Sequence, residues 1–272
     1  MQRQARPIRR SGAEQHRGPG APAAPRGLPR VQRPVRVPGP PQAAGQALVR
    51  LRRRPRGVPG EASPDPDLAA GRLYFITPDV DPPRLAALAL AAVRGGADIV
   101  QLRHKHLARG ELLAAARALR AITAEANRLF VVNDHVDIAL LSGADAVHVG
   151  PDDITVEGAR SAAGDRLLIG ASASTPEAGR QAIAAGADYL GVGPAFETPV
   201  KTEKKVIGPE GVLKVANAAG AEVPVFAIGG IDESNVQQLT RLGLHRVCVI
   251  RAIGDARDPE AAARRLRAML EA

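Results

Sequence analysis

The sequence predicts an α/β protein that folds as a closed (β/α)₈ TIM barrel, preceded by a disordered N-terminal extension. From residue 68 onward, short apolar runs rich in β-branched residues alternate with Ala/Leu-rich stretches. Strand–helix alternation with short connections requires a parallel sheet. Eight such repeats occupy about 205 residues, and a compact (β/α)₈ barrel needs roughly 200 or more. An open doubly wound sheet is the second choice, but no early G-x-G-x-x-G sequence supports it.

The predicted elements follow one another in a regular order. Eight runs are apolar or β-branched, as expected of strands covered on both faces; they are residues 73–77, 99–103, 129–133, 146–149, 167–172, 189–193, 223–228 and 246–250. The helical patterns are residues 84–94, 111–127, 135–142, 155–162, 176–185, 210–219, 233–242 and 259–270. Before three of the strands, a glycine that closes a helix is followed by Ala and then Asp98, Asp145 or Asp188.

Residues 1–67 differ in composition from residues 68–272, which we expect to form the TIM-barrel domain. The first segment has 14 Arg, no Lys and four acidic residues, a net charge of +10; the whole chain carries +9, so residues 68–272 carry −1. It also holds 13 of the 23 Pro and no apolar periodicity. Such a segment cannot bury enough surface to offset its chain entropy, and we therefore expect disorder.

Three interpretations of the extension compete. The Arg-rich run at residues 50–56 is compatible with binding to nucleic acid or another acidic surface. A transit peptide would also be Arg-rich, but the density of proline opposes an amphipathic helix. The third interpretation, which we favour, is an extension without a role, since GC-rich DNA encodes this residue bias in any frame.

Cysteine usage and hydropathy bound the class of protein. The single Cys248 excludes an intramolecular disulfide and disfavours a zinc site. No run approaches the roughly 18 apolar residues of a transmembrane helix. We expect a cytoplasmic protein with no membrane partner, disfavour nucleic acid against small molecules as its partner, and leave a homo-oligomer open.

The end of the second strand carries three long polar side chains. Gln101, Arg103 and Lys105 alternate along the chain and therefore project to one side. Two cations and an amide at this place predict a cradle for phosphate or pyrophosphate. In (β/α)₈ barrels the chemistry lies at the C-terminal ends of the strands, so polar residues after the other strands should converge with them.

Two acidic residues follow the neighbouring strands. Asn133 and Asp134 end the third strand, and Asp153 lies just after the fourth. Two nearby carboxylates repel each other unless a cation lies between them, and oxygen ligands suit Mg²⁺. The alternative for Asp134 and Asp152 is a helix N-cap. Beside a basic cradle, the acids favour a Mg²⁺–pyrophosphate site.

The remaining strand ends predict a second anion site. Ser172 lies on the fifth strand, and Gly229 and Gly230 follow the seventh. Glycines here, together with the end of the eighth strand, form the phosphate-binding corner of many barrels. Two anion sites on one rim suit a transferase that joins two phosphorylated molecules and releases pyrophosphate. His148 and Cys248 are interpreted as core residues.

These residues together resemble the thiamine phosphate synthase family, over essentially all of residues 70–272. The matching motifs are Gln101-Leu-Arg-His-Lys105, Asn133-Asp134 with Asp137, His148-Val-Gly150 with Asp153, Ser172, Gly193-Pro194 with Thr198 and Lys201, Ile228-Gly-Gly-Ile231, and Ile250-Arg-Ala-Ile253. The resemblance implies a transferase that condenses 4-amino-5-hydroxymethyl-2-methylpyrimidine diphosphate with 4-methyl-5-(2-phosphooxyethyl)thiazole. The products would be thiamine phosphate and pyrophosphate.

The resemblance also implies a role for each matching residue. Asp134 and Asp153 would hold Mg²⁺. The residues expected to take part in catalysis are Arg103, Lys105, Asn133, Ser172 and Lys201. All of them would contact substrate, together with Gln101, Leu102, His104, Thr198, Pro199, Val200, Gly230, Ile250 and Arg251. The diphosphate would lie on Arg103, Lys105, Asn133 and Lys201, and the pyrimidine on Gln101 and Ser172. The thiazole phosphate would lie on Thr198, Gly230 and the backbone of Ile250 and Arg251.

The chain departs from the family pattern at four positions. Pro151 stands where Gln is usual, Ser174 where His is usual, Val200 where Thr is usual, and Arg251 where Ser is common. One alternative function is the related thiazole tautomerase, in which a histidine after the fifth strand moves a proton; Ser174 takes that place here. The others are a sugar-phosphate isomerase or epimerase with His148 as acid or base, and a non-catalytic phosphate-binding barrel tethered to nucleic acid by its extension.

Overall fold

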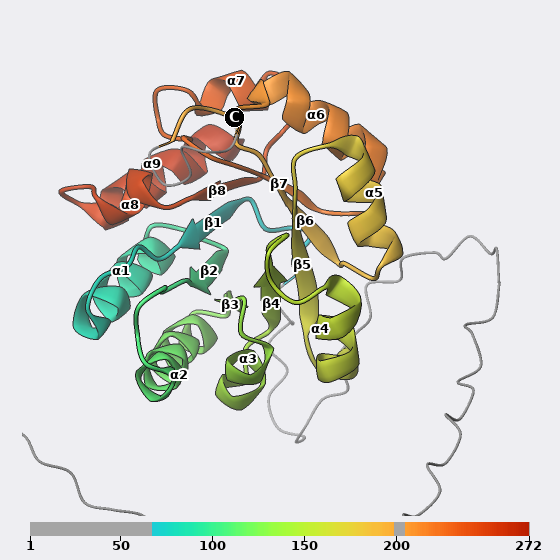
Figure 1. Cartoon of the computed structure of the whole chain (residues 1–272). Helices are drawn as coiled ribbons and strands as arrows, with labels where there is room; N and C mark the ends of the chain where they lie inside the picture. Colours follow the sequence, from blue (N-terminus) through green and yellow to red (C-terminus); the bar gives the residue numbers. More distant parts are fainter. Residues whose placement is uncertain (1–66, 199–204, 272) are drawn as a thin grey trace, which may run out of the picture. The chain divides into compact units, whose positions relative to one another are not determined.

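The computed structural model describes residues 67–198 and 205–271. Eight parallel strands close into a barrel in sequence order, with β8 pairing back onto β1 (Figure 1). The strands are β1 Leu73–Ile76, β2 Ile99–Leu102, β3 Leu129–Asn133, β4 Ala146–Val149, β5 Leu168–Ala173, β6 Tyr189–Val192, β7 Val225–Ile228 and β8 Val247–Val249. The predicted (β/α)₈ barrel is confirmed. The predicted disorder of the extension concerns residues that, apart from Asp67, lie outside the described ranges.

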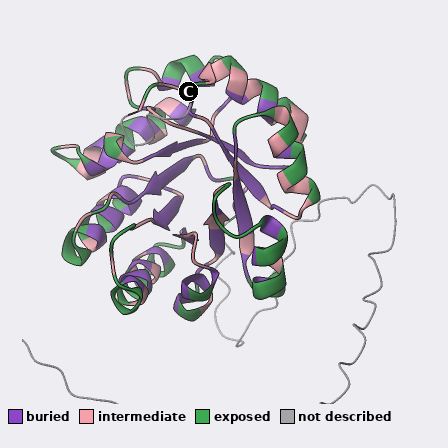
Figure 2. Ribbon diagram, in the orientation of Figure 1, coloured by how far each residue is buried: buried purple, intermediate pink, exposed green. Residues whose placement is uncertain are grey.

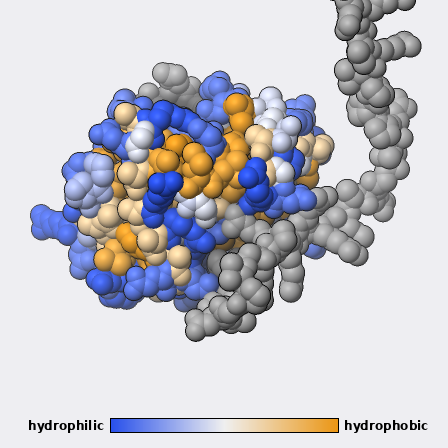
Figure 3. All heavy atoms as spheres, turned by 90° about the horizontal axis from the view of Figure 1, so that it is seen from below, coloured by the Kyte–Doolittle hydropathy of each residue, from blue (hydrophilic) through white to orange (hydrophobic). Residues whose placement is uncertain are grey.

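Helices surround the barrel (Figure 1). Within the described ranges they are α1 Pro82–Arg94, α2 Arg109–Glu125, α3 Val136–Ser142, α4 Val156–Ala163, α5 Pro176–Ala184, α6 Gly208–Ala219, α7 Val236–Thr240, α8 Arg251–Gly254 and α9 Pro259–Glu271, with a 3₁₀ turn at Gly164–Arg166. None of these helices is long and apolar enough to cross a membrane. The outer side seen in Figure 3 is a mosaic of hydrophilic and apolar residues, as expected of amphipathic helices packed on a barrel.

Two helices differ from the sequence prediction. The short α8 follows β8 directly and was not predicted. The helix expected at residues 233–242 is shorter, because side chains close a turn before it. The Asp232 carboxylate accepts the Ser234 N–H at 2.8 Å, and the Asn235 side-chain oxygen accepts the Asp232 N–H at 3.0 Å. These residues bond locally instead of entering the helix.

The core has two layers, because strand side chains alternate between the two faces of the barrel wall. Leu73 and Phe75 point outward and pack in the layer between strands and helices. Tyr74 belongs to a smaller layer inside the barrel, with Tyr189 and Phe226 among its members. Figure 2 shows buried strands and helices whose exposed faces turn outward.

Three aspartates secure the N-terminal end of the barrel, and they explain the repeated Gly-Ala-Asp sequence. Each lies just before an even-numbered strand and accepts a backbone N–H from the preceding strand or its first flanking residue. The bonds run from Arg72 and Leu73 to Asp98 at 2.8 and 3.1 Å, from Phe130 to Asp145 at 2.8 Å, and from Ile169 to Asp188 at 2.7 Å. Each also pairs with arginine: Arg128 with Asp98, Arg120 with Asp145 and Arg160 with Asp188, at 3.1, 3.4 and 2.5 Å.

Candidate active site

A cavity of about 460 Å³ opens at the C-terminal ends of the strands. Most of the predicted site residues in the described ranges line it: Gln101, Arg103, Asn133, Ser172, Thr198, Gly230, Ile250 and Arg251. They come from different strands and loops, and they meet because all strands of a parallel barrel end at the same rim. Pro199, Val200 and Lys201 lie outside the described residues, so their predicted roles stay predictions.

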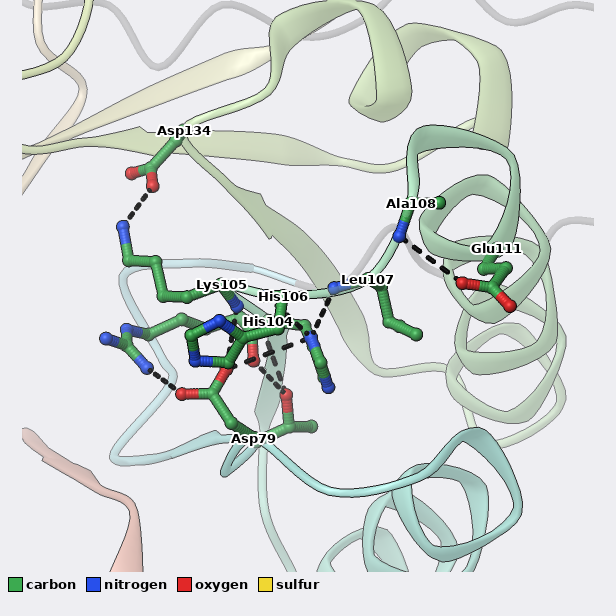
Figure 4. A network of polar contacts seen from close by, with 10 residues as sticks. Asp79, His104, Lys105, His106, Leu107, Ala108, Glu111 and Asp134 are labelled. Atoms are coloured by element: carbon green, nitrogen blue, oxygen red, sulfur yellow. Dashed lines mark hydrogen bonds and ion pairs between the residues drawn. The ribbon is translucent and has the colours of Figure 1, made fainter. Parts of the chain in front are cut away.

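A carboxylate that the sequence did not identify organises the basic cradle. Asp79, just past the end of β1, accepts a hydrogen bond from the Arg103 guanidinium at 3.2 Å and from the Lys105 backbone N–H at 2.7 Å (Figure 4). Thr77 supports the same segment, because its hydroxyl accepts the Arg103 N–H at 3.0 Å and donates to the Arg103 carbonyl at 3.1 Å. Asp79 and Arg103 are far apart in sequence but adjacent here, since β1 pairs with β2.

Three predicted substrate-binding residues in the described ranges do not line the cavity: Leu102, His104 and Lys105, whose Nζ donates to Asp134. The Leu102 side chain is buried in the layer between the barrel and the helices, because alternation on β2 places it opposite Gln101. His104 Nδ1 accepts the backbone N–H groups of His106 and Leu107 at 3.2 and 3.0 Å (Figure 4). A ring nitrogen that accepts carries no proton, so the approach of His104 Nδ1 to Asp79 at 3.9 Å is not a charged pair. His104 instead stabilises the turn before α2.

The two predicted metal ligands lie together and interact through their carboxyl groups. Asp134 accepts a hydrogen bond from Lys105 Nζ at 2.7 Å (Figure 4) and another from Asp153. Partial burial acts to raise the pKa of Asp134, but the hydrogen bonds from Asp153 and Lys105 outweigh it and lower that pKa. Partial burial raises the pKa of Asp153, and the hydrogen bond and charge of Asp134 raise it further. Two carboxyls with opposite pKa shifts favour a shared proton or a shared cation.

This pair fits a hard divalent cation. Mg²⁺ binds through one or two carboxylates and completes its shell with water and substrate phosphate oxygens. The described ranges contain no group of three or more His, Cys, Asp or Glu arranged for a metal, so a cation at this pair would take its other ligands from water or substrate oxygens. The N-cap alternative is wrong, because His135 caps α3 and Thr155 caps α4 in place of Asp134 and Asp152.

The deep wall of the cavity is polar. Gln101 Nε2 donates to the Tyr74 hydroxyl at 2.7 Å, and this hydroxyl lies 3.1 Å from the Tyr189 hydroxyl. On the other side, His148 Nε2 and Ser172 Oγ are hydrogen-bonded at 3.0 Å. The interpretation of His148 as a core residue is wrong, because its side chain is on the cavity wall. The register of β4 with β5 pairs His148 with Gly170, two residues before Ser172, so the side chains of His148 and Ser172 lie on the same face of the barrel wall.

The opposite part of the rim is built from backbone. Gly229 and Gly230 have φ angles of 100° and 64°, in the left-handed region that favours glycine. A Cβ at Gly230 would overlap the Glu197 carbonyl, so no side chain fits there. Asn235 Nδ2 donates to the Gly230 carbonyl at 2.8 Å and secures the turn. The short α8 starts at Arg251 on the same rim, as expected of a phosphate corner.

Comparison with known proteins places these features in a family. The family model described as thiamine monophosphate synthase matches residues 73–253. A thiamine-phosphate synthase of Gloeobacter violaceus is 44% identical over 192 residues, which are 71% of this chain and 55% of the relative, so the chain spans about half of that protein. One from Salinibacter ruber is 41% identical over 187 residues, or 68% of this chain and 82% of the relative. A solved thiamine phosphate pyrophosphorylase from Pyrococcus furiosus matches with a TM-score of 0.67 and 36% identity, covering 74% of this chain and 95% of that one.

Proposed function

This chain belongs to the thiamine monophosphate synthase family, and we propose that it is a transferase that forms thiamine phosphate. Its substrates would be 4-amino-5-hydroxymethyl-2-methylpyrimidine diphosphate and 4-methyl-5-(2-phosphooxyethyl)thiazole, and pyrophosphate would leave. The observation that supports this most is the position of two different anion sites on one cavity. The basic cradle at Arg103 and the glycine turn at Gly230 both line it.

The basic cradle would bind the diphosphate. Arg103 and Lys105 carry charge that Asp79 and Asp134 hold in place, so the cations need little reorganisation when the substrate arrives. Asp134 and Asp153 would hold Mg²⁺, which, when bound, neutralises charge on the departing diphosphate oxygens. Asn133, on the same wall, would donate its amide N–H groups to phosphate oxygens.

The reaction would be a displacement at the pyrimidine methylene carbon. The bond from this carbon to the diphosphate oxygen breaks, and the electron pair leaves with pyrophosphate. The thiazole nitrogen then forms the new bond to carbon. Charge grows on the leaving oxygens, so Arg103 and Lys105 would stabilise the transition state more than the ground state. The thiazole phosphate would lie on the backbone N–H groups near Gly230 and Arg251.

Single-turnover formation of thiamine phosphate tests this proposal. The full chain would be mixed with both substrates and Mg²⁺, beside Asp134→Ala. We expect product from the wild type and a loss of about 10²–10³-fold or more in the variant, because a ligand and the Lys105 partner are both removed. Asp152→Ala is the matched control, since it neighbours Asp153 but makes none of these contacts. A folded wild type that forms no product would contradict the proposal, and thiazole tautomerase activity would be assayed next.

The predicted cytoplasmic location is part of the same proposal, because both substrates are charged, phosphorylated molecules that do not partition into a membrane. Cell fractionation would test it. Light scattering of the purified chain would show whether it forms a homo-oligomer.

A further inference from the structure

Three buried side chains form a chain of hydrogen bonds beneath the cavity. Gln101 Nε2 donates to Tyr74 Oη at 2.7 Å, and Tyr74 Oη is 3.1 Å from Tyr189 Oη. Gln101 is 2% exposed, Tyr74 1% and Tyr189 0%. Buried polar groups in a low-dielectric interior are costly unless they are paired, so such a chain is strongly constrained. Only the Gln101 end reaches the cavity.

The contact with Gln101 favours one direction for the hydroxyl protons. Burial raises the pKa of Tyr74, and its hydrogen bond to Tyr189 raises that pKa further. Burial also raises the pKa of Tyr189, whereas the hydrogen bond from Tyr74 lowers it. The geometry agrees with these effects: Tyr74 Oη accepts from Gln101 Nε2 at 2.7 Å, and Tyr189 Oη, 3.1 Å away, is the other hydrogen-bond partner that the described residues give it. We therefore infer that Tyr74 donates its one proton to Tyr189 and accepts from Gln101 with a lone pair.

The Gln101 carbonyl oxygen consequently faces the cavity. Among the residues that the structure describes, no donor bonds to Gln101 Oε1, while Gln101 itself lines the cavity wall. The amide can turn its NH₂ group to the cavity only if Tyr74 donates to Oε1 in its place. That change would require the proton of Tyr74 to leave Tyr189, so the direction of the hydroxyls and the orientation of the amide are coupled.

Packing keeps both rings in place. A Cβ at Gly170 would overlap the Tyr189 ring, so this ring occupies the space that a side chain at residue 170 would need. Phe226 packs edge-on against Tyr74 and Tyr189, with ring centroids 5.4 and 6.0 Å apart. The hydroxyl groups therefore cannot swing away from each other without displacing the inner core.

We propose that Tyr74 and Tyr189 are positioning residues that turn the Gln101 carbonyl oxygen toward the cavity and so select a ring with an amino group. The preferred ring would donate an N–H to this oxygen, and a ring with a carbonyl oxygen at the same place would be rejected. The assignment rests on the proposed function, since the ring would be that of the pyrimidine substrate. Neither tyrosine touches substrate; each acts through Gln101.

The test compares two substrates on three full-length proteins with Mg²⁺ and the thiazole phosphate. One substrate is the aminopyrimidine diphosphate, and the other is its analogue with a ring carbonyl in place of the amino group. We expect the wild type to favour the amino substrate by about 10²-fold or more in kcat/KM, because a mispaired buried polar group is costly. Tyr189→Phe removes the acceptor of the Tyr74 proton, so Tyr74 should donate to Oε1 and reverse the amide. We expect this ratio to fall by roughly tenfold or more, mainly through KM.

Two further variants separate hydrogen bonding from packing. Tyr74→Phe removes the partner of Nε2 and should also lower the ratio, with weaker binding of both substrates. Phe226→Leu disturbs the packing of both tyrosine rings but removes no hydroxyl, so it should lower the melting temperature and leave the ratio unchanged. An unchanged ratio in Tyr189→Phe, or an equal fall in Phe226→Leu, would overturn the assignment. A wild type without turnover of either substrate would overturn the proposed function, and this assignment with it.

Discussion

Both ends of the barrel carry aspartates, but the two sets have opposite electrostatic surroundings. At the N-terminal end, Asp98 accepts two backbone N–H groups and pairs with Arg128. At the C-terminal end, Asp153 lies against another carboxylate, and partial burial together with Asp134 raises its pKa. The first arrangement satisfies a negative charge and stabilises the fold. The second leaves negative charge in excess, which is unfavourable for the empty protein and useful for binding a cation.

Asp153→Asn should have the largest effect on activity. We expect a loss of about 10²–10³-fold in kcat/KM, because a predicted metal ligand is removed. Stability without Mg²⁺ should stay equal or rise at neutral pH, since the amide relieves repulsion with Asp134. Steady-state kinetics and thermal unfolding measure the two effects, with Asp152→Asn as the neighbouring control.

The pH dependence of the Asp153→Asn effect has a definite sign. A raised folded-state pKa means that Asp153 contributes stability below its unfolded value of 3.8 and loses it as the pH rises through the folded value. The stability gained by Asp153→Asn should therefore grow with pH above 3.8. The effect should be small, because solvent screens a partly exposed pair. A gain that shrinks with rising pH would contradict this account of the C-terminal end.

Asp98→Asn should act mainly on stability. The substitution weakens the bonds to Arg72 and Leu73 and leaves Arg128 without its partner. We expect the free energy of unfolding to fall by about 2–4 kcal/mol, with kcat/KM of the folded protein within about twofold of the wild type. Denaturant unfolding and kinetics at a permissive temperature would measure this, beside Glu125→Gln on an exposed helix position. A large loss of kcat in the folded variant would contradict the assignment of stability to the N-terminal aspartates and of activity to the C-terminal ones.

Asp79→Asn should give a smaller effect that is confined to the cradle. The amide oxygen can still accept the Lys105 N–H, so the loop should keep its shape, but the charge that holds the Arg103 guanidinium is lost. We expect KM for the pyrimidine diphosphate to rise by roughly tenfold and kcat to change less, since one charge-assisted hydrogen bond is weakened. Asp79→Ala, which loses both bonds, should be worse. A wild-type KM in Asp79→Asn would show that the charge on Asp79 does not position Arg103.

Several parts of the site were predictable from local pattern. Alternation on β2 places Gln101 and Arg103 on one face, and the ends of neighbouring parallel strands bring Asp134 and Asp153 together. Asp79 and Tyr189 could not be found in this way. Asp79 is one acid in an exposed loop, and nothing in its sequence surroundings links it to Arg103. Tyr189 lies in an apolar strand, and the sequence does not show that its hydroxyl contacts Tyr74. Leu102 was misplaced because a motif match does not say which of its side chains face the cavity.

The sequence by itself determined the barrel, because strand and helix periodicities and the glycines between them depend on near neighbours in the chain. It also determined which strand ends carry charge. Tertiary structure alone decided the pairing of Asp79 with Arg103, the position of His148 on the cavity wall and the hydrogen-bond chain from Gln101 to Tyr189. These contacts join residues 24 to 115 positions apart. Their geometry depends on the register and twist of the strands in the closed barrel. Neither can be predicted from a local sequence pattern.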